Sequence, residues 1–259
     1  VPFARHQTLS AAKPAHRELM AGIMPSHECR IRSAALMRTL LEVIVQSVVD
    51  ARGAARAGAD RLQVVRRIQD GGLTPPLALV REIAAEVSLP LRVMVRENAG
   101  YTTSPVELLS LQRAAAAFAE LQVDGLVVGF AADGEIELEP VSHVMDAAPG
   151  IKVTFHRAFD ELRDPLASID RLASVAGIDR ILTSGGEGPS AIRRPRLRAY
   201  QERAGARLAF VHVRRQRDER GLREAGIVLD DLAGEERHHR ISRLHQHGEG
   251  RRDDVVAVQ

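Results

Sequence analysis

The sequence predicts an α/β protein built as a (β/α)8 barrel of the TIM type. Short apolar runs alternate with helix-like segments at regular spacing, which is typical of βαβ units and a parallel sheet. The length of 259 residues suits one such barrel. Three helix ends lead through an aspartate into the next apolar run, at Asp60, Asp124 and Asp179. We expect these aspartates to cap strand entries at the N-terminal face of the barrel.

Each predicted strand is a short apolar run, and several predicted helices begin at a capping signal or a proline. The predicted strands cover residues 41–45, 60–65, 91–95, 125–128, 151–155, 180–183, 207–211 and 226–229. The predicted helices cover residues 48–57, 75–86, 105–120, 139–147 and 165–175, a segment ending at 201–204, and 221–225. Ser47 and Ser104 are candidate N-caps, and Glu107 stands at the capping-box position after Ser104.

The two ends of the chain lack this pattern. Residues 1–37 have no sustained apolar period, so we expect a poorly ordered N-terminal extension before a barrel over residues 38–229. After Phe210 the pattern weakens, and residues 213–220 are a run of charge, so the last one or two βα units are poorly defined. Residues 230–259 are dense in Arg and His, which favours a poorly ordered charged tail.

Composition narrows the functional classes. The single cysteine, Cys29, allows no disulfide within the chain and suits a reducing compartment. A net charge of +2 and 3% aromatic residues argue against nucleic-acid binding, even by the arginine-rich residues 193–223. No apolar run is long enough to span a membrane, and the first residues lack the continuous apolar stretch of a secretory signal. We therefore expect a cytoplasmic protein with no membrane partner.

The predicted fifth strand ends in charged residues. His156, Arg157 and Asp160 follow the apolar run 151–155, before a helix that begins near Pro165. In a parallel barrel, the C-terminal ends of the strands are where catalytic groups gather. His156 is either a general acid or base, because its ordinary pKa lies near neutrality, or a core histidine with satisfied hydrogen bonds.

Two more charged residues complete the candidate catalytic set of Glu42, Arg96, His156, Arg157 and Asp160. Glu42 lies within the predicted first strand, where an ionised carboxylate is costly unless it is paired. Arg96, after the third strand, and Arg157 are its expected partners. The pair is either a structural ion pair that fills the barrel or part of an active site.

The sequence also suggests an anion site but no tight metal site. Thr183, Ser184, Gly185 and Gly186 present backbone amides before a helix, which is typical of an anion nest. Within residues 40–210 there is no cysteine, and the histidines and methionines (His143, His156, Met94 and Met145) lack ligand spacing for copper. Outside this range, His27 with Cys29 is too small a ligand set. The tail histidines His238, His239, His245 and His247 either chelate a divalent ion or form a solvated tail.

Seven short motifs occur in an order and spacing that resemble the CutC family, which is named for copper homeostasis. They are residues 41–45, 71–76, 93–96, 124–129, 133–134, 154–160 and 182–186. The resemblance implies a (β/α)8 barrel that is cytoplasmic, homo-oligomeric and assigned to copper handling. The sequence departs from the family pattern at Glu97–Asn98, at Val64–Val65 and at the arginine-rich residues 213–220.

Two functional hypotheses follow. The first is the family assignment, a cytoplasmic copper-homeostasis protein that binds copper only weakly. The alternative is a metal-independent barrel enzyme that acts by acid/base chemistry on a small anionic substrate, either phosphorylated or carboxylated. Two arginines and an acid/base pair suit proton transfer, whereas Lys152 stands at a strand start, on the wrong face for Schiff-base chemistry.

Overall fold

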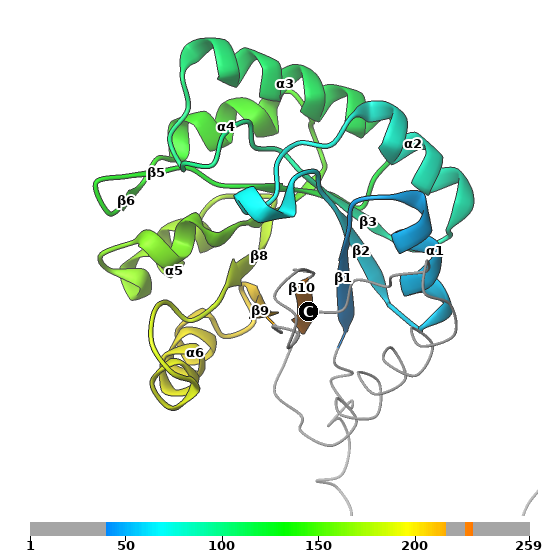
Figure 1. The fold of residues 1–259 in the computed structure, drawn as a ribbon. Helices are drawn as coiled ribbons and strands as arrows, with labels where there is room; N and C mark the ends of the chain where they lie inside the picture. Colours follow the sequence, from blue (N-terminus) through cyan, green and yellow to red (C-terminus); the bar gives the residue numbers. More distant parts are fainter. Residues whose placement is uncertain (1–39, 216–225, 230–259) are drawn as a thin grey trace, which may run out of the picture. The chain divides into compact units, whose positions relative to one another are not determined.

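Eight strands close into a barrel in the computed structural model, which describes residues 40–215 and 226–229 (Figure 1). The strands are β1 (Leu41–Val45), β2 (Arg61–Val64), β3 (Leu91–Met94), β4 (Gly125–Val128), β7 (Lys152–Phe155), β8 (Ile178–Thr183), β9 (Ala209–Arg215) and β10 (Gly226–Leu229). Neighbours along the chain are neighbours in the barrel, and β1 to β9 pair in parallel. The predicted α/β barrel is therefore confirmed. The predicted extension, charged tail and helix 221–225 lie outside the described residues.

The last strand differs from the (β/α)8 pattern. Strand β10 runs antiparallel to both of its neighbours, β9 and β1. Only residues 216–225 separate β9 from β10, and a parallel return requires a crossover of about a dozen residues or more. An antiparallel return needs no helix across the sheet, so a short charged connection is enough. The barrel closes, but its eighth strand has the opposite direction to the one that a regular βα repeat would give.

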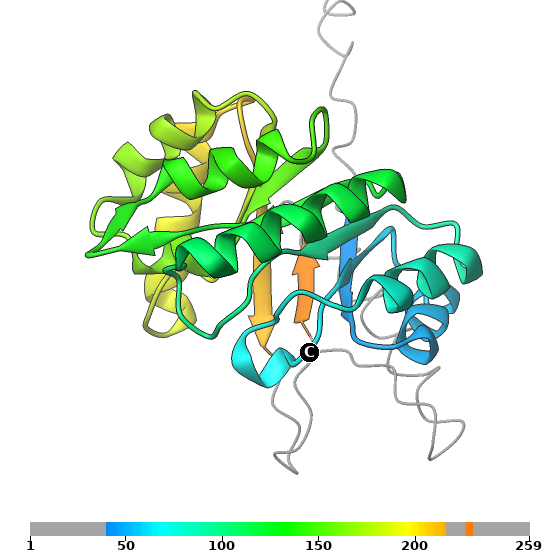
Figure 2. The same cartoon turned by 90° about the horizontal axis from the view of Figure 1, so that it is seen from above.

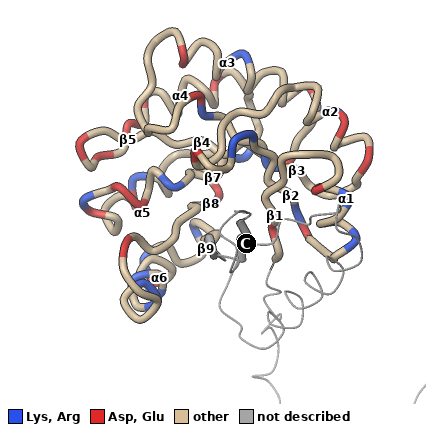
Figure 3. The backbone as a smooth tube through the Cα atoms, in the orientation of Figure 1, with Lys and Arg blue, Asp and Glu red and all other residues tan. Residues whose placement is uncertain are grey.

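Helices cover the outside of the sheet (Figures 1 and 2). They are α1 (Val48–Arg56), α2 (Leu77–Glu86), α3 (Pro105–Glu120), α4 (Leu138–Asp146), α5 (Pro165–Ala173) and α6 (Ser190–Ala204), with short 3-10 helices η2 (Ile68–Asp70) and η3 (Arg157–Glu161). Ser47 caps α1, and Ser104 forms the predicted capping box with Glu107. Acidic and basic residues are interspersed over these helices, whereas α6 is mainly basic (Figure 3). No helix in the described ranges is long and apolar enough to cross a membrane.

A small hairpin that the sequence did not predict lies between β4 and α4. It pairs β5 (Ala131–Ala132) with β6 (Glu135–Ile136) around Asp133 and Gly134, both of which have positive φ. Asp133 and Gly134 form the fifth of the seven family motifs, so the motif marks a tight turn. The carbonyl of Gly134 accepts a hydrogen bond from the amide of Arg163, which ties the hairpin to the chain after η3.

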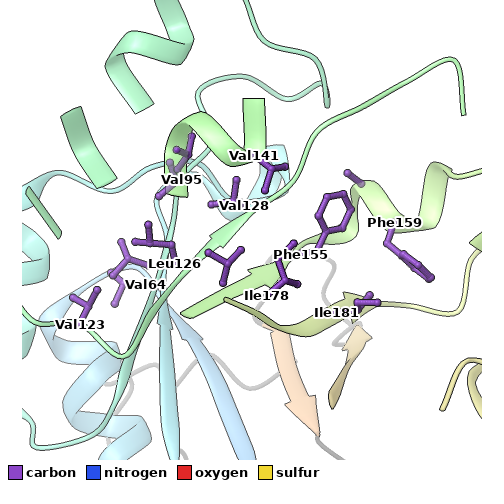
Figure 4. Packing of buried hydrophobic residues seen from close by; sticks show 14 of the residues in the cluster. Val64, Val95, Val123, Leu126, Val128, Val141, Phe155, Phe159, Ile178 and Ile181 are labelled. Carbon is purple, nitrogen blue, oxygen red and sulfur yellow. The ribbon is translucent and has the colours of Figure 1, made fainter. Parts of the chain in front are cut away.

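Side chains alternate between the two faces of each strand, and the barrel therefore has two apolar cores. One set of side chains faces the helices and forms the larger core, which includes Val64, Val128 and Phe155 (Figure 4). The other set points into the barrel, where six buried residues form a smaller cluster: Ile44, Val65, Met94, Val127, Leu182 and Val211. This smaller cluster, called here the apolar layer, fixes which charged side chains can meet inside the barrel.

Candidate functional site

The apolar layer divides the charged residues of the barrel interior into two groups. Glu42 lies two residues before Ile44 on β1, and Arg180 lies two residues before Leu182 on β8. These positions face inward on the N-terminal side of the layer, called here the floor. Arg96 lies two residues after Met94, and Ser184 two residues after Leu182. Those positions face inward on the C-terminal side, called here the mouth.

Glu42 belongs to the floor and not to the mouth. Its carboxylate accepts a hydrogen bond from the guanidinium Nε of Arg61, the residue beside it on β2, and both side chains are buried. The prediction that Arg96 or Arg157 pairs with Glu42 was wrong, because the apolar layer lies between them. Of its two predicted interpretations, a structural ion pair that fills the barrel fits this position.

Arg92 is the most deeply buried charge of the floor. Its side chain is fully buried, and its guanidinium binds Asp124 at 2.7 Å and Asp179 through two hydrogen bonds of 3.0 and 2.8 Å. Burial alone would lower the pKa of Arg92, but the hydrogen bonds and charges of Asp179 and Asp124 outweigh it and raise the pKa. Two of the predicted strand-entry aspartates therefore compensate a buried arginine.

Two glycines of β4 make room for the charged side chains next to them. A Cβ on Gly125 would lie 2.4 Å from Nη1 of Arg92, and a Cβ on Gly129, just after the strand, would lie 2.6 Å from Nδ1 of His156. Neither contact is tolerable, so any side chain at these positions would displace its neighbour. The glycines at the two ends of this strand thus allow one buried arginine in the floor and one buried histidine at the mouth.

Arg96 is a buried cation at the mouth without a carboxylate partner among the described residues. Its guanidinium donates to the backbone carbonyls of Gly100 (3.2 Å), Gly71 (3.3 Å) and Ala99, and it lies 4.6 Å from the ring centre of Tyr101. Burial and the nearby charge of Arg157 lower its pKa, although Tyr101 acts in the opposite direction. Its positive charge is therefore balanced by carbonyl dipoles, an aromatic face and the charge of Asp70, with which it forms no ion pair.

His156 lies beside Arg96 and is a neutral hydrogen-bond donor. The amide of Ala158 donates to its Nδ1 at 3.2 Å, so the proton of the neutral ring belongs on Nε2. That Nε2 is buried and has no hydrogen-bond partner among the described residues. Burial, followed by the charge of Arg96, lowers the pKa of His156 to about 3. This lowered pKa disfavours a general acid or base that is protonated near neutral pH, because burial and a nearby cation both oppose uptake of a proton.

Asp160 occupies the predicted anion nest. Its carboxylate accepts hydrogen bonds from the amide of Ser184 (3.1 Å), the hydroxyl of Ser184 (2.7 Å), the hydroxyl of Thr183 and the Nε of Arg157 (3.0 Å). The amide of Gly185 donates to the hydroxyl of Thr183. Gly185 and Gly186 both have positive φ, as the turn requires. The carboxylate of Asp160 therefore lies where the sequence predicted an external anion, held by one backbone amide, two hydroxyls and Arg157.

The mouth therefore gathers most of the predicted site and leaves one member out. Arg96, His156, Arg157, Asp160 and the nest residues Thr183, Ser184, Gly185 and Gly186 lie at the C-terminal ends of β3, β7 and β8. Glu42 lies on the other side of the apolar layer. No group of three or more His, Cys, Asp or Glu side chains in the described ranges is placed to hold a metal ion.

Sequence reasoning missed three residues that shape these sites. Arg61 and Arg92 face into the barrel from apolar strands, and a charge at an inward position of such a strand was the available signal. Tyr101 contacts Arg96 and lies 5.5 Å from His156, ring centre to ring centre. It follows β3 in a loop, where one sequence offers no period to place it.

Comparison with known proteins agrees with the motif pattern. Residues 39–227 match the sequence profile of the CutC family. The human copper homeostasis protein cutC homolog is 34% identical over 174 residues, which cover 66% of this chain and 63% of that protein. The family protein CutC of Enterobacter sp. (strain 638) is 37% identical over 150 residues, 57% of this chain and 60% of that protein. The chain thus spans about three-fifths of the length of these relatives.

A solved structure shares the fold. The crystal structure of a CutC protein from Streptococcus agalactiae superposes with a TM-score of 0.61 at 25% sequence identity. The match covers 65% of this chain and 84% of that one. The similarity supports the barrel assignment independently of the order of the sequence motifs.

Proposed function

This chain belongs to the CutC family, and from that premise we propose that the mouth of its barrel binds a small anionic ligand through Arg96 and His156. The observation that carries the proposal is the buried, unpartnered Nε2 of His156 beside a buried arginine with no carboxylate partner in the described ranges. A buried donor without a partner costs about 1–3 kcal/mol, and a ligand oxygen would recover that energy. The positive charge of Arg96 favours an anion as the source of that oxygen.

The chemistry that these residues support is polarisation of a bound oxygen. A neutral imidazole that donates from Nε2 stabilises negative charge developing on a carbonyl or carboxylate oxygen. Arg157 and Asp160 are bound to each other, and the carboxylate of Asp160 is already surrounded by donors. We therefore assign Arg96 and His156 to ligand binding, and Arg157 and Asp160 to positioning. A cytoplasmic location and a homo-oligomeric state, which the family resemblance implies, are part of the same proposal.

Thermal unfolding in the presence of malonate tests the anion site. We expect malonate at ten times its Kd to raise the Tm of the wild-type chain by about 3–5 °C relative to chloride of equal ionic strength. Arg96→Met should abolish the shift, because it removes the buried positive charge at the mouth. Arg52→Met is the matched control, since Arg52 lies half exposed on α1 and pairs with Glu86. A wild-type shift that persists in Arg96→Met would place the malonate elsewhere.

Copper handling is the second candidate, and the names of the relatives favour it. The human relative is named a copper homeostasis protein, and this chain shares its family. The described part of the barrel offers no cluster of metal-binding side chains, so we place any copper ligands outside it. Cys29 and the four tail histidines all lie beyond the described residues.

Titration of the full chain with Cu(I) in a calorimeter tests that placement. We expect binding to be weak. It should fall further when His238, His239, His245 and His247 are replaced together by alanine, because the replacement removes four imidazole groups that can bind copper. The control is the same substitution followed by malonate titration, which should be unaffected. Tight, stoichiometric Cu(I) binding that survives the four replacements would contradict this expectation and support a copper site elsewhere in the chain.

A further inference from the structure

The carboxylate of Asp160 fills the anion nest and so affects which ligands the mouth can bind. We propose that Asp160 is a specificity-determining residue, which fills the nest of the β8–α6 loop and restricts this part of the mouth to ligands with a carboxylate or carbonyl group instead of a phosphate group. The inference rests on the proposed function, because it names the ligand class of the same mouth.

The first step is that Asp160 saturates the nest. An ionised carboxylate offers about four lone-pair sites. Donors from Ser184, Thr183 and Arg157 supply four: the Ser184 amide and hydroxyl, the Thr183 hydroxyl and the Arg157 Nε. The side chain of Asp160 is 5% exposed, so solvent does not compete for these sites. The nest thus holds a permanent internal anion.

The second step is that the first two amides of this loop are already engaged, so a phosphate group cannot use them. Phosphate recognition at a loop before a helix relies on several backbone N–H groups that converge on one anion. The Ser184 amide is taken by Asp160, and the Gly185 amide is taken by the hydroxyl of Thr183 at 2.9 Å. Arg193 and Arg196 of α6 hold the carbonyls of Ser184 and Gly185, each at 3.3 Å, which fixes the loop in this conformation. A phosphate dianion would also meet the negative charge of Asp160.

The third step is that the donors left at the mouth suit a smaller group. His156 offers one N–H, from Nε2. The guanidinium of Arg96 has five N–H groups, of which three donate to backbone carbonyls. Three donors remain, two on Arg96 and one on His156. They can pair most of the about four lone-pair sites of a carboxylate, whereas a phosphate group adds a third oxygen and further negative charge.

Removal of the Asp160 carboxylate from the nest tests this proposal. In Asp160→Ala, the donors of Ser184, Thr183 and Arg157 lose their anion, and inorganic phosphate can take its place. We expect phosphate at ten times its Kd to raise the Tm of this variant by about 3–5 °C relative to chloride of equal ionic strength, with no shift in the wild type. Asp160→Asn is the matched control: it keeps the volume and one acceptor oxygen, so the nest stays filled and phosphate should have no effect.

Asp160→Ser is the second variant, to be used if Asp160→Ala does not fold in chloride. Its hydroxyl can still accept a hydrogen bond from the Ser184 amide. Equal phosphate responses in the wild type and in the vacated variants would overturn the inference. Failure of both variants to fold even in phosphate would overturn it as well, since phosphate should refill the nest that the substitution empties. Malonate separates the two proposals: if it does not bind the wild type while phosphate stabilises Asp160→Ala, the proposed function fails and the filled nest stands.

Discussion

Replacement of Arg92 by alanine is expected to lower the free energy of unfolding by about 3 kcal/mol, the largest loss for any single charge in the barrel. The guanidinium of Arg92 is fully buried and binds Asp124 and Asp179, which are themselves about one-third exposed. Its removal leaves Asp124 and Asp179 with Arg180, at 4.0 and 3.5 Å, as their remaining cation, and opens a cavity under the apolar layer. Solvent reaches the two aspartates in part, which keeps the loss at the lower end of the range for a broken buried pair.

Urea unfolding measures this loss, and Arg52→Ala is the matched control. Arg52 pairs with Glu86 on the surface, with both side chains about half exposed, so its removal should cost no more than about 0.5 kcal/mol. Arg92 has two carboxylate partners and Arg52 has one, so the comparison sets a fully buried arginine against a half-exposed one. A loss below about 1 kcal/mol for Arg92→Ala would show that the floor does not depend on this arginine.

The barrel could be predicted because its signals are local and repeated. The apolar runs, the caps at Ser47 and Ser104 and the spacing of strands and helices each depend on near neighbours in the chain. The direction of β10 was not accessible in this way, because its pairing with β1 joins segments that are far apart in the sequence. The short connection before β10 was the only sequence feature that restricted the direction of this strand.

The sequence predicted where the residues of the candidate site lie better than it predicted which of them interact. Strand ends identify which residues reach the mouth, so Arg96, His156, Arg157 and Asp160 were found together. Their pairing depends on contacts across the barrel, which one sequence does not reveal. Thus Glu42 was assigned the wrong partner, and the nest at Ser184 was expected to take an external anion although Asp160 fills it.

A change of pH from 7.5 to 4.5 should cost the wild-type protein about 3 kcal/mol more stability than it costs His156→Gln. The pKa of His156 is about 3 in the folded protein and 6.5 when unfolded, so at intermediate pH the unfolded chain binds the extra proton. Stability from this residue is therefore full above pH 6.5 and is lost progressively as the pH falls towards 3. Glutamine cannot titrate, and its variant lacks this slope.

The measurement is urea unfolding of both proteins at each pH, with the imidazole followed by NMR in the folded wild type. We expect the His156 ring signals to stay constant down to pH 4.5, because burial and the charge of Arg96 keep the ring neutral. A titration midpoint near 6.5, or equal losses in the two proteins, would contradict the buried neutral state. The same neutrality determines the role of His156 in the mouth: across the physiological range it offers a ligand its Nε2 proton as a hydrogen bond, and it has no second proton to transfer as a general acid.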